Sequence, residues 1–132
     1  ERLALAARVR FLGRRDDALG LLAGCDLLVL PSRREGLGVS ALEAMAARRP
    51  VVASRVGGLA DAVVDGRTGL LVEPENPEAL AQAIARLAAD AELRRSLGEA
   101  GPGRLAEGFL ASQMVAAYEK LYRSVLEERK SA

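Results

Sequence analysis

The most informative absence in this 132-residue chain is histidine, which does not occur at all. Without histidine the chain cannot form a Ser/His/Asp triad, a histidine general base or a histidine-ligated metal site. Tryptophan is missing too, and aromatic residues make up only 3% of the chain, which argues against stacking on single-stranded nucleic acid. Any chemistry here must therefore use carboxylates, arginines, hydroxyls or backbone amides.

Cysteine, long apolar runs and net charge are also scarce. The one cysteine, Cys25, leaves no intramolecular disulfide to form, and we expect it to be a small buried residue just before a strand. The apolar runs are far too short to span a membrane, and no secretory signal is visible. The net charge of +1 gives no reason to expect nucleic acid or an anionic membrane as partner. We therefore expect a cytoplasmic protein, with peripheral membrane association of a complete protein left open.

Short apolar runs separated by helical segments organise the first half of the chain. Four runs are hydrophobic without alternation, as in strands covered on both faces, and span residues 9–13, 26–32, 50–54 and 69–73. The helical patterns between them span residues 16–25, 39–48 and 59–65. Strands that alternate with helices indicate β-α-β units. We therefore predict an α/β fold with a Rossmann-like parallel sheet and flanking helices.

The second half is predicted to be mostly helical, with helices over residues 76–90, 91–101 and 110–128. Asn76 is a good N-cap and Pro77 suits the first helical position, whereas Gly101 and Pro102 should stop the next helix. The last helix carries an apolar stripe that is most simply a packing face. Residues 1–8 read as the tail of a helix already under way, so we expect the chain to be a piece of a longer protein.

The segment "PSRREGLGVSALEAMAARRP", residues 31–50, carries the chemistry. It follows the carboxyl end of a predicted strand and leads into the helix that begins near Val39, where backbone amides and the helix dipole attract phosphate. Gly36 and Gly38 let the backbone approach such an anion closely. Glu35 and Glu43, separated by seven residues, can each accept two hydrogen bonds from a vicinal diol. A diphosphate between two hydroxylated rings, that is a nucleotide sugar, fits this arrangement.

Simpler interpretations of the same residues stay open. Glu43 could be a solvated residue in the middle of a helix, Glu35 a loop charge, and the two glycines an ordinary turn. Two alternative functions stay open. The chain could belong to a nucleotide-sugar epimerase on the same fold, or it could be a non-catalytic module that binds nucleotide or mediates assembly.

The stretch "VRFLG…DLLVLPSRREGLGVSALEAMAARRPVVASRVGGLADAVVDGRTGLLV" resembles the carboxy-terminal domain of retaining nucleotide-sugar glycosyltransferases of the GT-B fold, the group with the E-x7-E motif. The resemblance runs in order from about residue 8 to 100 and less sharply to about 125. It implies that residues 1–132 are a partial nucleotide-sugar-binding domain, with a core over 8–100 and carboxy-terminal helices over 101–132. A separate amino-terminal domain of that family binds the acceptor.

The resemblance also implies roles for particular residues. Glu35 would act as the catalytic glutamate by holding hydroxyls of the transferred sugar, and Glu43 would bind the ribose. The backbone around Arg10 would lie near the base. No metal or further cofactor is implied, since basic side chains and the helix N-terminus meet the charge of the leaving diphosphate. The amides that would bind the diphosphate and sugar belong to Gly36, Leu37, Gly38, Val39 and Ser40.

Two departures from the family pattern give further expectations. Arg48 stands where the family usually has glycine, so the motif helix must end without a glycine cap. The family's first two strands would precede residue 1 and would lie between the strands at 9–13 and 26–32. The sheet would then have unpaired edges, which favour association. We therefore expect the isolated chain to form a homodimer, or to be unstable as a monomer, and to be inactive without the acceptor-binding domain.

Overall fold

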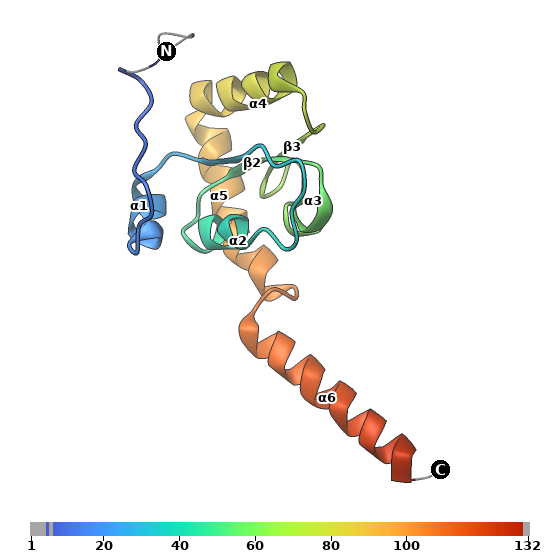
Figure 1. The fold of residues 1–132 in the computed structure, drawn as a ribbon. Helices are drawn as coiled ribbons and strands as arrows, with labels where there is room; N and C mark the ends of the chain where they lie inside the picture. The colour runs from blue at the N-terminus through green and yellow to red at the C-terminus, as the bar shows by residue number, and fades with distance from the viewer. Residues whose placement is uncertain (1–4, 6, 131–132) are drawn as a thin grey trace.

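The computed structural model describes residue 5 and residues 7–130. Within these residues one parallel sheet has the strand order β1-β2-β3, with β1 at Leu28–Leu30, β2 at Val51–Ser54 and β3 at Gly69–Val72. The helices are α1 (Ala18–Gly24), α2 (Val39–Ala46), α3 (Gly57–Ala62), α4 (Pro77–Ala89), α5 (Ala91–Ala106) and α6 (Ala111–Lys130) (Figure 1). The predicted α/β fold with a parallel sheet and flanking helices is confirmed.

Strand β2 is the centre of the sheet and of the core. It pairs with β1 in the register Val29 to Val52 and with β3 in the register Val52 to Leu70. All residues of β2 are buried, whereas β1 is only half-buried because its other edge has no strand partner among the described residues. The continuous apolar sequence of β2 follows from this position, since both of its faces are covered by helices.

Two apolar clusters lie on opposite faces of the sheet. Val51 and Ala53 face the cluster under α2 and α3, which includes Met45 and Leu59. Val52 faces the cluster under α4 and α5. Each fully buried leucine or methionine side chain contributes roughly 1.5–3 kcal/mol to folding. The alternation along β2 therefore ties the helices of both layers to one strand.

The predicted strand at residues 9–13 is wrong. These residues form an irregular segment ahead of α1, and the Phe11 side chain is 93% exposed. A strand satisfies its backbone amides only by pairing with a neighbour. No strand among the described residues lies alongside this segment, so its apolar composition alone does not produce a strand.

Helices α3 and α5 and one burial prediction also differ from expectation. Helix α3 spans Gly57–Ala62 rather than 59–65, and α5 continues past Pro102 to Ala106. The continuation is explained by packing, because Leu105 reaches the cluster under α2 and outweighs the hydrogen bond that proline cannot donate. Cys25 is exposed rather than buried, since none of the described elements covers the turn between α1 and β1.

The predicted start of α4 is confirmed. The Asn76 side chain accepts a hydrogen bond from the Ala79 amide at 2.9 Å, and Pro77 occupies the first turn of α4. Arg48 follows α2 in the left-handed conformation, with φ of 57°, and so takes the backbone geometry that glycine usually supplies.

Helix α6 extends away from the rest of the molecule (Figure 1). Its large apolar side chains are all half or more exposed except Val125 at 45%, so no described element covers the stripe that was predicted to be a packing face. None of the described helices is long and apolar enough to cross a membrane. The predicted helical tail at residues 1–8 lies mostly outside the described residues.

Candidate functional site

The candidate site is the loop of residues 31–38 together with the start of α2. The loop leaves the carboxyl end of β1, and Gly38 is the N-cap of α2 in the left-handed conformation, with φ of 75°. The Gly38 carbonyl accepts hydrogen bonds from the amides of Ala41 at 2.8 Å and Leu42 at 3.3 Å, and no side chain caps the helix. The amides of Val39 and Ser40 thus lie at a helix start that an anion could complete.

The two glutamates flank this helix start. Glu35 is half-buried in the loop, and its carboxylate accepts a hydrogen bond from the Gly36 amide at 3.1 Å. Glu43 is half-buried on α2, and it shares a side of the helix with Val39 and Ser40, which lie four and three residues before it. The buried residues of α2 are Ala41, Ala44 and Met45, so they form the core side of the helix.

The start of α3 packs directly against the loop. The Gly58 amide donates to the Gly36 carbonyl at 2.8 Å and more weakly to the Glu35 carbonyl at 3.4 Å. A Cβ at Gly58 would lie 2.6 Å from the Leu37 Cα, and a Cβ at Gly57 would overlap the Glu35 carbonyl. Only glycines allow α3 to approach the loop this closely.

The support extends to the helix cap itself. A Cβ at Gly38 would lie 2.6 Å from Cδ2 of the buried Leu59, so the cap rests directly on a side chain of α3. The supporting residues Gly57, Gly58 and Leu59 lie outside the predicted site residues. Two consecutive glycines, two residues after the end of the buried strand β2, are the sequence signal that could have identified them.

A cleft of about 360 Å³ opens beside this loop at the carboxyl edge of the sheet. It is lined by residues at or just beyond the ends of all three strands, including Pro31 after β1, Ser54 at the end of β2 and Glu73 after β3, and by the start of α4. Arg33 and Glu75 form an exposed ion pair of 3.0 Å beside it. Neither Glu35 nor Glu43 lines this cleft. Its volume is near the low end of small-ligand pockets, roughly 300–1,000 Å³.

Arg10 is exposed in the irregular segment before α1. Within the described part of the chain it makes no hydrogen bond or ion pair. Among the same residues no group of three or more acidic or cysteine side chains is placed to hold a metal ion. The other predicted site residues all belong to one continuous segment, the loop and α2, and are Glu35, Gly36, Leu37, Gly38, Val39, Ser40 and Glu43.

Known proteins resemble the chain in sequence and in structure. The N-acetyl-alpha-D-glucosaminyl L-malate synthase of Bacillus anthracis is 37% identical over 129 residues, which cover 98% of this chain and 34% of that protein. The sucrose-phosphate synthase of Thermosynechococcus elongatus has a TM-score of 0.90 at 38% identity, covering 96% of this chain and 32% of that one. Anabaena HepE, solved in complex with UDP, has a TM-score of 0.73 at 29% identity, covering 99% and 34%.

The chain thus spans about a third of the length of the curated relatives that it matches. The family model described as glycosyl transferases group 1 matches residues 1–90, which include both strand-to-helix connections that build the candidate site. The chain belongs to the glycosyl transferases group 1 family.

Proposed function

We propose that this chain is the donor-binding part of a retaining glycosyltransferase, which transfers a sugar from a nucleoside-diphosphate sugar to an acceptor hydroxyl. The observation that carries the proposal is the start of α2, which has a left-handed glycine cap, no capping side chain and a glutamate on either side. Solved complexes of Anabaena HepE with UDP and with UDP-glucose support a nucleotide-sugar donor.

In this proposal the loop and the start of α2 bind different groups of the nucleotide sugar. The amides of Gly36 to Ser40 bind the diphosphate and the adjoining sugar, and their charge stabilisation grows as the diphosphate leaves. One well-placed donor of this kind contributes roughly 3 kcal/mol to the transition state. Glu43 accepts hydrogen bonds from the ribose diol, and Glu35 holds the hydroxyls of the transferred sugar near the reacting carbon.

The E-x7-E assignment and the retaining stereochemistry belong to the proposal, as does metal independence. The acceptor binds to a further domain of a longer polypeptide, because the curated relatives are about three times as long as this chain. The donor site by itself positions no acceptor hydroxyl, and the isolated chain is therefore inactive.

A titration tests the donor site directly. UDP, GDP and ADP and their glucose or mannose conjugates are titrated by calorimetry into the complete gene product and into the 132-residue chain. At least one nucleotide should bind with micromolar affinity, and Glu43→Gln should weaken it at least about tenfold, since a charge-assisted pair of hydrogen bonds is lost. Glu99→Gln, an exposed glutamate on α5, is the matched control.

Two results would contradict the proposal. If none of the nucleotides bound to the complete gene product, the proposed donor site would be refuted. Equal effects of Glu43→Gln and Glu99→Gln would place the ribose elsewhere. Nucleotide binding without any sugar transfer by the complete gene product would instead support the non-catalytic alternative. For an active enzyme, the anomeric configuration of the product, measured by NMR, decides between retention and inversion.

A further inference from the structure

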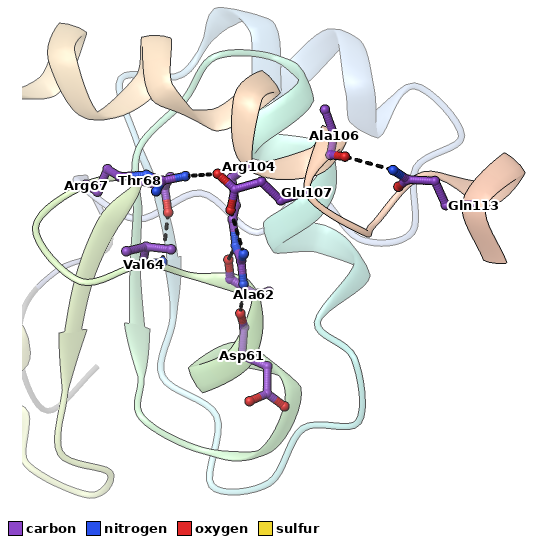
Figure 2. A network of polar contacts seen from close by, with 9 residues as sticks. All are labelled: Asp61, Ala62, Val64, Arg67, Thr68, Arg104, Ala106, Glu107 and Gln113. Carbon is purple, nitrogen blue, oxygen red and sulfur yellow. Dashed lines mark hydrogen bonds and ion pairs between the residues drawn. The ribbon is translucent and has the colours of Figure 1, made fainter. Parts of the chain in front are cut away.

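Arg104 connects the carboxyl end of α5 to the carboxyl end of α3 (Figure 2). Its Nε donates to the Ala62 carbonyl at 3.1 Å, and a terminal nitrogen donates to the Asp61 carbonyl. These are the last two residues of α3, whose carbonyls have no partner further along the helix. The Arg104 side chain is only 20% exposed, and its bond to the Ala62 carbonyl is partly buried.

Other side chains hold the Arg104 guanidinium in place. Glu107 accepts a hydrogen bond from Arg104 at 2.8 Å and another from Arg67 (Figure 2). The guanidinium carbon lies 4.8 Å from the centre of the Phe109 ring, within the range of a cation–π contact. Hydrogen bonds from Arg104 first and from Arg67 second lower the pKa of Glu107, which keeps this carboxylate charged. The guanidinium is therefore fixed in one orientation.

Helix α3 has only six residues, about 9 Å of helix, and both of its ends are held. At its start Gly58 binds the Gly36 carbonyl, and Leu59 lies under Gly38. At its end Arg104 binds the last carbonyls. Because close-packed elements transmit displacements rather than absorbing them, a shift at the end of α3 moves the loop at its start.

We propose that Arg104 is a positioning residue for the donor loop, which holds residues 35–38 in their binding geometry through α3. The inference rests on the proposed function, because it concerns the same site. It goes beyond the motif residues by assigning a role to a side chain 42 residues away in sequence from the α3 carbonyl that it binds. Among the described residues no hydrogen bond or ion pair joins Arg104 to the loop.

The test separates positioning of the loop from general stabilisation of the domain. The variants are Arg104→Met, which keeps the length of the side chain, and Arg104→Lys, which keeps its charge but not its fork of donors. Arg95→Met, an exposed arginine on the same helix that is paired with Glu92, is the matched control. In the complete gene product, the affinities for the best-binding sugar nucleotide among UDP-glucose, GDP-mannose and ADP-glucose and for its nucleoside monophosphate are both measured.

The loop is proposed to contact the diphosphate and sugar, whereas Glu43 contacts the ribose. Arg104→Met should therefore lower the affinity for the sugar nucleotide at least about fivefold more than the affinity for the monophosphate. Arg104→Lys should cause a smaller loss of sugar-nucleotide affinity, and Arg95→Met should change neither affinity. Equal losses for both ligands, or no loss in either Arg104 variant, would overturn the positioning role. If Arg104→Met does not fold, the milder Arg104→Lys decides by the same ratio. Absence of binding by the unsubstituted protein would instead refute the proposed function itself.

Discussion

The contact between Gly58 and the donor loop leads to a quantitative prediction for Gly58→Ala. The added Cβ would lie 2.1 Å from the Gly36 carbonyl oxygen and 2.6 Å from the Leu37 Cα, whereas an ordinary contact begins at 3.4 Å, so the loop and α3 must separate by about 1.3 Å. Overpacking of this kind costs about 1–3 kcal/mol of folding free energy. A displacement near 1 Å in a binding geometry can lower turnover about 100-fold.

The experiment compares two glycine-to-alanine variants of the complete gene product. Gly103 lies inside α5 with nothing within 4 Å of an added Cβ, so Gly103→Ala should stabilise the protein by about 0.5–1 kcal/mol. Thermal denaturation measures the stability of both variants, and calorimetry with the sugar nucleotide measures the site. Gly58→Ala should be less stable than the unsubstituted protein and should bind the sugar nucleotide more weakly.

A Gly58→Ala variant that kept both the stability and the sugar-nucleotide affinity of the unsubstituted protein would refute this role of Gly58. The same conclusion would follow if Gly103→Ala lowered the affinity for the sugar nucleotide as strongly as Gly58→Ala, because the effect would then not depend on the close approach of α3 to the loop.

Three further predictions concern the rest of the chain. Arg48→Gly should raise the stability by about 0.5–1 kcal/mol, because Arg48 has a φ of 57°, which is unfavourable for any residue with a Cβ. Thermal denaturation measures this change, and a lower melting temperature would contradict it. The pKa of Glu107 is lowered in the folded state by its hydrogen bonds, so its contribution to stability is present above its ordinary pKa of 4.5 and is lost as the pH falls through the folded value. Melting temperatures of the unsubstituted protein and of Glu107→Gln should therefore differ near neutral pH and converge in acid, and a constant difference would exclude this linkage. The isolated chain should dimerise in light scattering through the edge of β1 that no described strand pairs with, and a stable, cooperatively melting monomer would argue against it.

Local sequence patterns were enough to predict much of the fold. The strands β1, β2 and β3 follow from continuous apolar runs, and α4 from an N-cap asparagine followed by proline, which the structure confirms. The same local signals indicated the loop of residues 31–38 and the start of α2 as a phosphate-binding geometry. Such features depend on neighbouring residues, so they can be read from a short stretch of chain.

Features that depend on distant residues could not be predicted in this way. Residues 9–13 have the composition of a strand but no partner among the described residues, and α5 passes Pro102 because Leu105 packs under α2. The support of the loop by Gly58 and the bonds from Arg104 to α3 join segments 22 and 42 residues apart. The sequence alone predicted the strands β1, β2 and β3 and the presence of the helices, and it indicated the start of α2 as a place where an anion could bind. Only the tertiary structure decided which side chains hold that site, because close approach and hydrogen bonding between distant segments exist only once the layers have packed.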